Sequence, residues 1–94
     1  MAKNVFVSYD LDAAPPERYA AVRKMIEDCS SKYSWIQFSL AYIKTDLRIE
    51  FIAQRVRSVM HATDKLAVIE SVDANVSPLS SQTLTVFQRE FTTA

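Results

Sequence analysis

The sequence predicts an α+β protein in which two helices pack on one face of a mainly antiparallel sheet. Short segments with alternating side-chain character indicate strands, and two segments with apolar residues every three or four positions indicate helices. They follow one another as strand, helix, long strand region, helix and strand. The chain has 94 residues, enough for one domain with a single core. We therefore expect one domain, with its core over residues 4–72 and a C-terminal extension over residues 73–94.

The first strand is expected at residues 4–10 and is followed by a helix. Alternate positions give the strand two faces, which are formed by Val5, Val7 and Tyr9 and by Phe6, Ser8 and Asp10. Pro15 and Pro16 suit the first turn of a helix, because the N–H that proline lacks has no partner there. The helix is expected to end near Ser30 or Ser31. Its apolar stripe consists of Tyr19, Val22, Met25, Ile26 and Cys29.

The segment SWIQFSLAYIKT at residues 34–45 is strand-like throughout. Its 12 residues are long for one strand, so it forms either two strands or one strand with a bend near residues 37–39. Simple alternation places Gln37 on the same face as Trp35 and Ala41. Asp46 then suits the N-cap of the second helix.

The second helix and two later strands complete the expected elements. The apolar stripe of this helix consists of Ile49, Ile52, Ala53, Val56, Val59 and Met60. Residues 65–72, KLAVIESV, are expected to form a strand, and residues 83–88, TLTVFQ, a last one. With this order of elements, we expect a ferredoxin-like sandwich with an extra C-terminal strand.

Apolar residues occupy both faces of the predicted strands, although two helices cover only one face. The second face therefore needs a cover, and a second copy of the chain is the simplest one. We expect a homodimer with the two sheets packed face to face. The strand at residues 83–88 then extends the sheet of the partner.

Composition excludes several classes of site. The chain has no glycine, so it lacks the glycine-rich loops that cradle phosphates. One cysteine and one histidine exclude an internal disulfide and multi-ligand zinc sites within one chain. Carboxylates remain as metal ligands, and they suit Mg²⁺ or Mn²⁺. The net charge is zero, whereas dedicated nucleic-acid binders usually have an excess of basic residues.

The N-terminal sequence MAKNVFVSYD lacks the features of a secretory signal. Apolar runs are also far shorter than the roughly 20 residues of a membrane span. We expect a cytoplasmic protein without membrane contact.

Four segments resemble a known superfamily. They are YDL at residues 9–11, the helix around Arg18, FSLAYIKTD at residues 38–46 and DKLAVIES at residues 64–71. They are similar to the small CRISPR-associated adaptation subunit, a dimeric, metal-dependent nuclease of ferredoxin-like fold. The resemblance is closer to its solitary SinR-like relatives, in which a strand of form S-x-x-x-[IV]-K-T-D precedes the second helix. Virulence-associated protein D, a toxin ribonuclease, is a further relative with the same opening strand and aspartate.

The resemblance implies a role for Asp10, which ends the first strand. In the nuclease subfamily, the matching aspartate meets its symmetry mate across the dimer and holds one divalent cation, here Mg²⁺ or Mn²⁺. Such an ion activates water and stabilises charge on a phosphodiester. Tyr9 and Ser39 match residues near that site.

Basic residues near the helix starts are the candidates for contact with nucleic acid. The family usually carries more arginine around the helix starts, and here Arg18 is the main candidate. Lys44 and Arg48, with Arg55 and Arg57, are candidates for a second basic surface. The alternative for these side chains is an ordinary solvated surface. RNA and DNA remain equally open as substrates.

The competing interpretation is a dimeric scaffold that binds protein or nucleic acid and cuts nothing. Zero net charge and the few carboxylates favour this scaffold, whereas the position of Asp10 in YDL favours a metal-dependent endonuclease. In the scaffold, Asp10 only closes the strand and caps the turn over residues 12–16.

Overall fold

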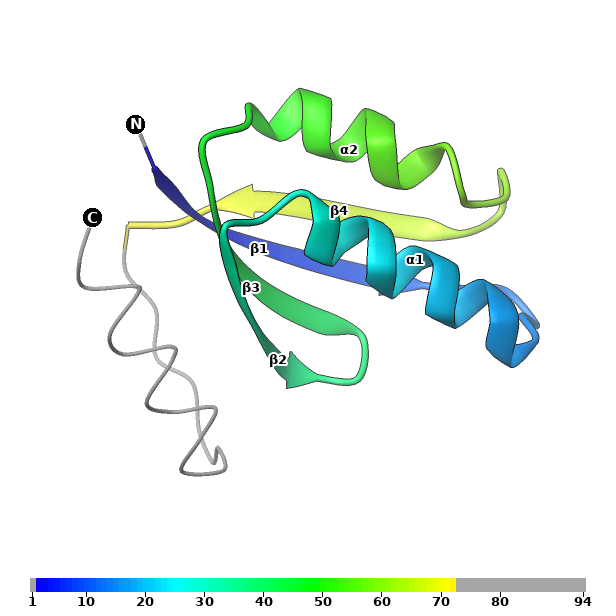
Figure 1. The fold of residues 1–94 in the computed structure, drawn as a ribbon. Helices are drawn as coiled ribbons and strands as arrows, with labels where there is room; N and C mark the ends of the chain where they lie inside the picture. Colours follow the sequence, from blue (N-terminus) through cyan, green and yellow to red (C-terminus); the bar gives the residue numbers. More distant parts are fainter. Residues whose placement is uncertain (1, 73–94) are drawn as a thin grey trace.

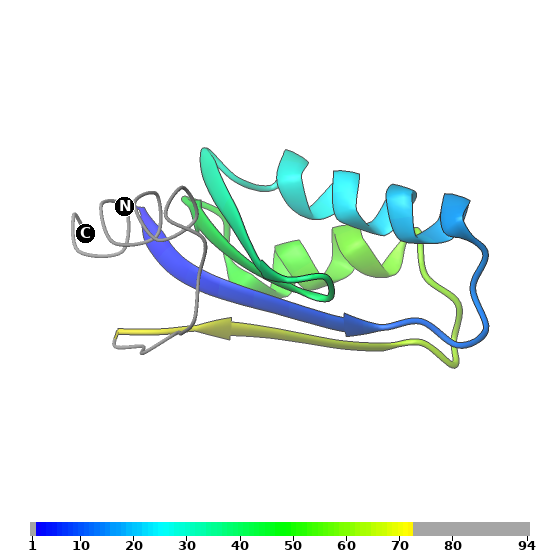
Figure 2. The ribbon, with the colours of Figure 1, turned by 90° about the horizontal axis from the view of Figure 1, so that it is seen from below.

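The computed structural model describes residues 2–72 and confirms the α+β class (Figure 1). Its elements are β1 (Lys3–Asp10), α1 (Pro16–Asp28), β2 (Lys32–Gln37), β3 (Leu40–Thr45), α2 (Ile49–Arg57) and β4 (Lys65–Glu70). The four strands form one antiparallel sheet in the order β2-β3-β1-β4, and both helices lie on the same face of it (Figure 2). This arrangement is a ferredoxin-like sandwich. The strand expected at residues 83–88 lies outside the described residues.

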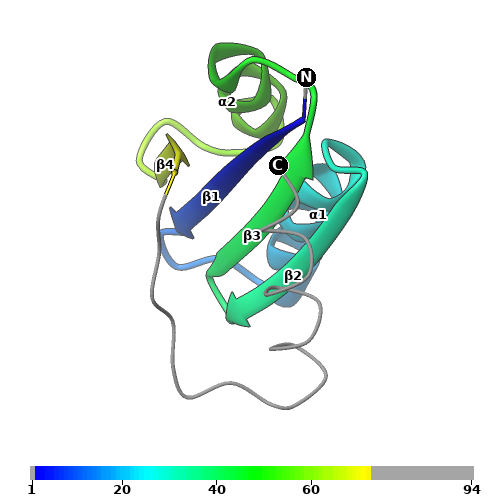
Figure 3. The ribbon, with the colours of Figure 1, turned by 90° about the vertical axis from the view of Figure 1, so that its left-hand side faces the viewer.

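β1 lies in the middle of the sheet, between β3 and β4 (Figure 3). Val7 of β1 is opposite Ala41 of β3 and Val68 of β4. As alternation predicts, Val5, Val7 and Tyr9 are buried beneath the helices. The helices complete this core with Val22, Ile26, Ile52 and Val56.

The segment at residues 34–45 belongs to two strands joined by a tight turn at Phe38 and Ser39. Trp35 is opposite Ala41, but the register shifts after it and Gln37 is opposite Leu40. Gln37 therefore shares the face of Leu40, and the expectation that it lies with Trp35 is wrong. The shift acts as a β-bulge, in which one extra residue reverses the alternation.

α2 begins at Ile49 with Arg48 at its N-cap, so the expected cap at Asp46 is wrong. The residue before Asp46 explains the difference. The Leu47 N–H donates to Thr45 Oγ1 at 3.0 Å. The backbone stays extended through Arg48 (φ −70°, ψ 146°), and the helix starts only after it.

The second face of the sheet, opposite α1 and α2, is also rich in apolar residues. Phe6 and Tyr42 lie on it with ring centroids 5.7 Å apart. Leu40 lies beside them, and Ile69 is 55% exposed. This face therefore has an apolar patch among polar side chains such as Asp10 and Lys65, and Tyr42 within the patch is fully buried. Among the described residues, no helix is long and apolar enough to cross a membrane.

Candidate functional site at the end of the first strand

Asp10 is the last residue of β1 and lies on the second face, because Tyr9 before it points into the core. The side chain of Asp10 is exposed. Within the described part of the chain its carboxylate makes no hydrogen bond or ion pair. Its partner across β4 is Lys65. Side chains directly opposite each other in an antiparallel pair project from the same face, so a cation lies next to the carboxylate.

Tyr9 and Ser39 support the end of β1. The Tyr9 N–H donates to the Ser39 carbonyl at 3.1 Å, beyond the last registered pair of β1 and β3. The Tyr9 hydroxyl donates to the Phe38 carbonyl at 2.8 Å. Burial raises the pKa of the Tyr9 phenol, although Arg23 opposes the shift. Tyr9 thus fastens the β2–β3 turn to β1, and Ser39 lies next to Asp10 along the sheet.

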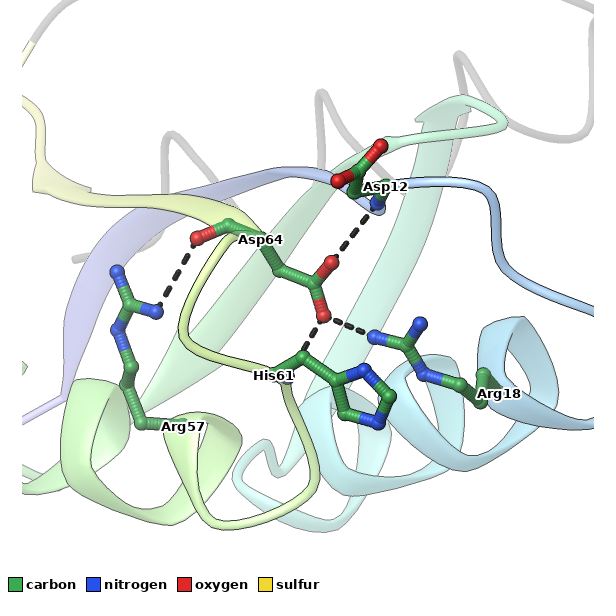
Figure 4. Close-up of polar contacts among 5 residues, drawn as sticks. All are labelled: Asp12, Arg18, Arg57, His61 and Asp64. Atoms are coloured by element: carbon green, nitrogen blue, oxygen red, sulfur yellow. Dashed lines mark hydrogen bonds and ion pairs between the residues drawn. The ribbon is translucent and has the colours of Figure 1, made fainter.

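The buried carboxylate at this end belongs to Asp64, which sequence reasoning did not single out (Figure 4). One carboxylate oxygen accepts from the Asp12 N–H at 2.8 Å. The other accepts from the His61 N–H at 2.8 Å and from the Arg18 guanidinium. The Arg57 guanidinium donates to the Asp64 carbonyl at 3.2 Å.

These contacts give Asp64 a structural role. The pKa of Asp64 lies below its usual value, chiefly because the Asp12 N–H donates to the carboxylate. The His61 N–H and the Arg18 charge lower the pKa further, whereas burial opposes the shift. The carboxylate joins the loop after β1, the first turn of α1 and the loop before β4. It therefore fixes the direction in which the chain leaves Asp10.

The structure places the predicted basic residues at two separate ends of the sheet. Arg18 is at the Asp10 end, where its side chain is 17% exposed and paired with Asp64. Lys44 lies beside Asn4 at the other end of β1, with its ammonium 3.0 Å from the Asn4 side-chain oxygen. Asn4 and Asp10 are about 20 Å apart along the strand at 3.3 Å per residue. Lys44 and Arg18 therefore do not belong to one local site.

Lys44 and Arg48 differ in the solvent exposure of their side chains. Lys44 is only 5% exposed, so contact with a phosphate would require its neighbours to move. Arg48 is exposed at the start of α2, and its guanidinium lies 3.6 Å from the Glu50 carboxylate. The exposed Arg48 is thus the more accessible of the two.

Divalent cations such as Mg²⁺ and Mn²⁺ are bound in proteins by carboxylates and other oxygen ligands. In residues 2–72, no three His, Cys, Asp or Glu side chains come together as a metal site. Asp10 offers an exposed carboxylate that no described residue engages, and carboxylates suit Mg²⁺ or Mn²⁺. One such ligand holds an ion weakly, so the residues fit a metal only if a second chain brings its own Asp10.

A cluster of aromatic rings and one arginine lies beside the β2–β3 turn. The Arg23 guanidinium stacks 3.7 Å above the Trp35 ring and 4.8 Å from the Phe38 ring centroid. Tyr19 lies 5.4 Å from Phe38, and Tyr9 lies 6.3 Å from Trp35. A break between two strands near residues 37–39 was one of the two expectations for this segment, and the hairpin places Phe38 at its exposed tip.

The fold and this end of the sheet define a small ferredoxin-like protein with an exposed aspartate after its central strand. No protein-family model matches the chain, and no curated protein matches its sequence.

Proposed function

We propose that the chain is a homodimeric relative of the CRISPR adaptation subunits, closest to the SinR-like proteins. In this proposal it associates with nucleic acid and cleaves phosphodiesters with a divalent metal ion held by Asp10 of both subunits. One observation carries the proposal: Asp10 ends a central strand on the second face of the sheet, and its exposed carboxylate makes no hydrogen bond or ion pair with another described residue.

The dimer is supported by the apolar character of the second face. Ile69 is 55% exposed there, and both helices lie on the opposite face of the sheet. Phe6, Leu40 and Tyr42 share this face, but Phe6 and Leu40 are half-buried and Tyr42 is fully buried, so Ile69 is the side chain of the four that is most available to a partner. A two-fold axis through this face is isologous, so each residue near the axis meets its own copy. If the axis passes near the end of β1, the two Asp10 carboxylates meet.

The chemistry then follows from the residues at that axis. A bound Mg²⁺ or Mn²⁺ ion supplies an activated water and neutralises charge on the phosphodiester. The two Asp10 carboxylates hold and orient the ion. Lys65, opposite Asp10 on β4, adds a positive charge that attracts a phosphate. Asp64 keeps the loop after Asp10 in place through the Asp12 N–H.

The test is a cleavage assay on single-stranded and duplex RNA and DNA, with Mg²⁺ or Mn²⁺ and with EDTA. Wild type is compared with Asp10→Ala and with the matched control Asp12→Ala. The Asp12 side chain is exposed two residues further on, and only its backbone N–H contacts Asp64. We expect metal-dependent cleavage by wild type and Asp12→Ala and its loss in Asp10→Ala. Equal activity, or equal inactivity, of wild type and Asp10→Ala rejects the proposed role of Asp10.

A dimeric scaffold without catalytic activity is the second candidate function. It is supported by the zero net charge and by the pairing of Arg18 with Asp64, which occupies the main candidate for phosphate contact. The scaffold predicts dimers and binding without cleavage under every condition of the assay above.

Both candidates require the dimer, which light scattering tests directly. At micromolar protein we expect the mass of two chains. A charged substitution on the second face, Ile69→Lys, is expected to reduce it to one chain while the circular dichroism spectrum is kept. A wild-type mass of one chain rejects the dimer and means that the second face is not an interface between copies.

A further inference from the structure

Phe38 is the most exposed aromatic side chain among the described residues, at 62%. It lies at the tip of the β2–β3 hairpin. The next residue, Ser39, accepts a hydrogen bond from Tyr9, and Asp10 follows Tyr9. Adjacent strands are about 5 Å apart, so this turn and Asp10 lie at the same end of the sheet. The Phe38 ring packs against α1, whereas the Asp10 side chain projects from the opposite face, so a nucleic acid that contacts both passes around this end of the sheet.

Phe38 is also unusually well fixed for an exposed residue. Its carbonyl accepts hydrogen bonds from the Tyr9 hydroxyl and from the Arg23 guanidinium. Its ring lies against Tyr19 and beside the same guanidinium, which stacks on Trp35. A ring held on one side and open on the other loses little conformational freedom when a flat group stacks on it.

We propose that Phe38 is a stacking platform for an unpaired base of a single-stranded nucleic acid. The inference rests on the proposed function and deepens it, because it makes a single strand the substrate class of the Asp10 site. Bases offer a free face to an aromatic ring only when they are not stacked within a duplex. The Arg23 guanidinium adds a cation next to the platform, which suits a nucleotide.

The surroundings of Phe38 favour a base over a protein partner. A protein interface is expected to present a contiguous apolar patch around an aromatic anchor. Phe38 instead stands between the polar residues Gln37 and Ser39, and Gln37 is exposed. Its remaining contacts are a tyrosine and an arginine, the residue types that accompany stacked bases.

The experiment measures the binding of a labelled 12-nucleotide single strand (about one site length) by fluorescence anisotropy in EDTA, with its duplex as competitor. We expect Phe38→Ala to weaken binding about tenfold or more, since one stacked base contributes about that factor. Phe38→Trp keeps the platform and is expected to retain wild-type affinity. Phe51→Ala is the matched control, because Phe51 is 45% exposed with Arg55 beside its ring but lies on α2.

The single tryptophan provides a second readout. Trp35 is joined to Phe38 through the stacked Arg23, so binding at Phe38 is expected to change Trp35 emission in wild type and not in Phe38→Ala. The inference is overturned if Phe38→Ala binds like wild type, if the duplex competes as well as the single strand, or if neither probe binds. A protein ligand that is lost in Phe38→Ala, without oligonucleotide binding, overturns it as well.

The two proposals fail in distinguishable ways. Binding that depends on Phe38 but is never followed by cleavage supports the platform and rejects the nuclease. Cleavage that depends on Asp10 but is unaffected by Phe38→Ala supports the nuclease and overturns the platform.

Discussion

Replacing Thr45 is predicted to lower the stability of the fold more than replacing most other polar residues. Its side chain is buried (2% exposed), and its hydroxyl donates to the Cys29 carbonyl at 2.7 Å and accepts from the Leu47 N–H at 3.0 Å. One oxygen thus joins the end of α1 to the chain that leads into α2. Valine has nearly the same shape, so Thr45→Val removes these two bonds and little else.

The cost follows from the burial of the two partners. Leaving the buried Cys29 carbonyl without its donor costs about 1–3 kcal/mol, and losing the part-buried bond from Leu47 costs about 0.5–1.5 kcal/mol. We expect Thr45→Val to lower the free energy of unfolding by about 2–4 kcal/mol. In a chain of this size, the midpoint of thermal unfolding then falls by roughly 10–20 °C.

Thr45→Ser is the matched control, because it keeps the hydroxyl and removes only one buried methyl group, at a cost of about 1 kcal/mol. Urea unfolding followed by circular dichroism and by the emission of Trp35 measures both variants, with an unchanged denaturant slope as the check on two-state behaviour. The reasoning is refuted if serine costs as much as valine, or if Thr45→Val unfolds at the wild-type urea concentration.

Two further predictions concern the loop after β1. The folded-state pKa of Asp64 lies below its unfolded value, so its charge stabilises the fold above about pH 4, and this contribution is lost as the pH falls through the folded pKa. Asp64→Asn is therefore expected to lower the free energy of unfolding at pH 7 and to make it depend less on pH on the acid side. Urea unfolding of wild type and variant at pH 7 and pH 3 tests this. If both proteins lose the same free energy of unfolding between the two pH values, the prediction is contradicted. Ala13 has a left-handed backbone (φ 49°), so Ala13→Gly is expected to raise the unfolding free energy by about 0.5–1 kcal/mol, whereas a decrease in thermal stability contradicts the strain.

The order of strands and helices could be predicted from the sequence, because the buried side chains recur every second residue in the strands and every three or four residues in the helices. Val5, Val7 and Tyr9 alternate cleanly, and both helices carry an apolar stripe, so the core could be predicted. Gln37 could not be placed, since a bulge has no signature in the alternation of side chains. The start of α2 was missed because Thr45 bonds Leu47 and delays the helix past Asp46.

The candidate site was predictable only in part. Alternation put Asp10 on the second face at the end of β1, where the structure has it. Asp64 looked like any loop aspartate, because its three donors come from separate segments that only the folded chain brings together. A break near Phe38 was expected as one alternative, but the exposure of its ring depends on the hairpin that turns at that position.

Asp10 ends β1, and Asp64 lies just before β4, the neighbouring strand. Their surroundings determine which of the two carboxylates can bind a metal ion. Asp64 already accepts two N–H groups and a guanidinium, so binding a cation there would leave buried donors unpaired and would place a positive charge beside Arg18. The Asp10 carboxylate makes no hydrogen bond or ion pair within the described residues, and it is exposed. Asp64, whose oxygens already accept hydrogen bonds, holds the loop in place, whereas the Asp10 oxygens remain available to a metal ion. The proposed metal site therefore belongs to Asp10, and it depends on a second subunit because Asp64, the buried carboxylate at this end of the described structure, is already hydrogen-bonded.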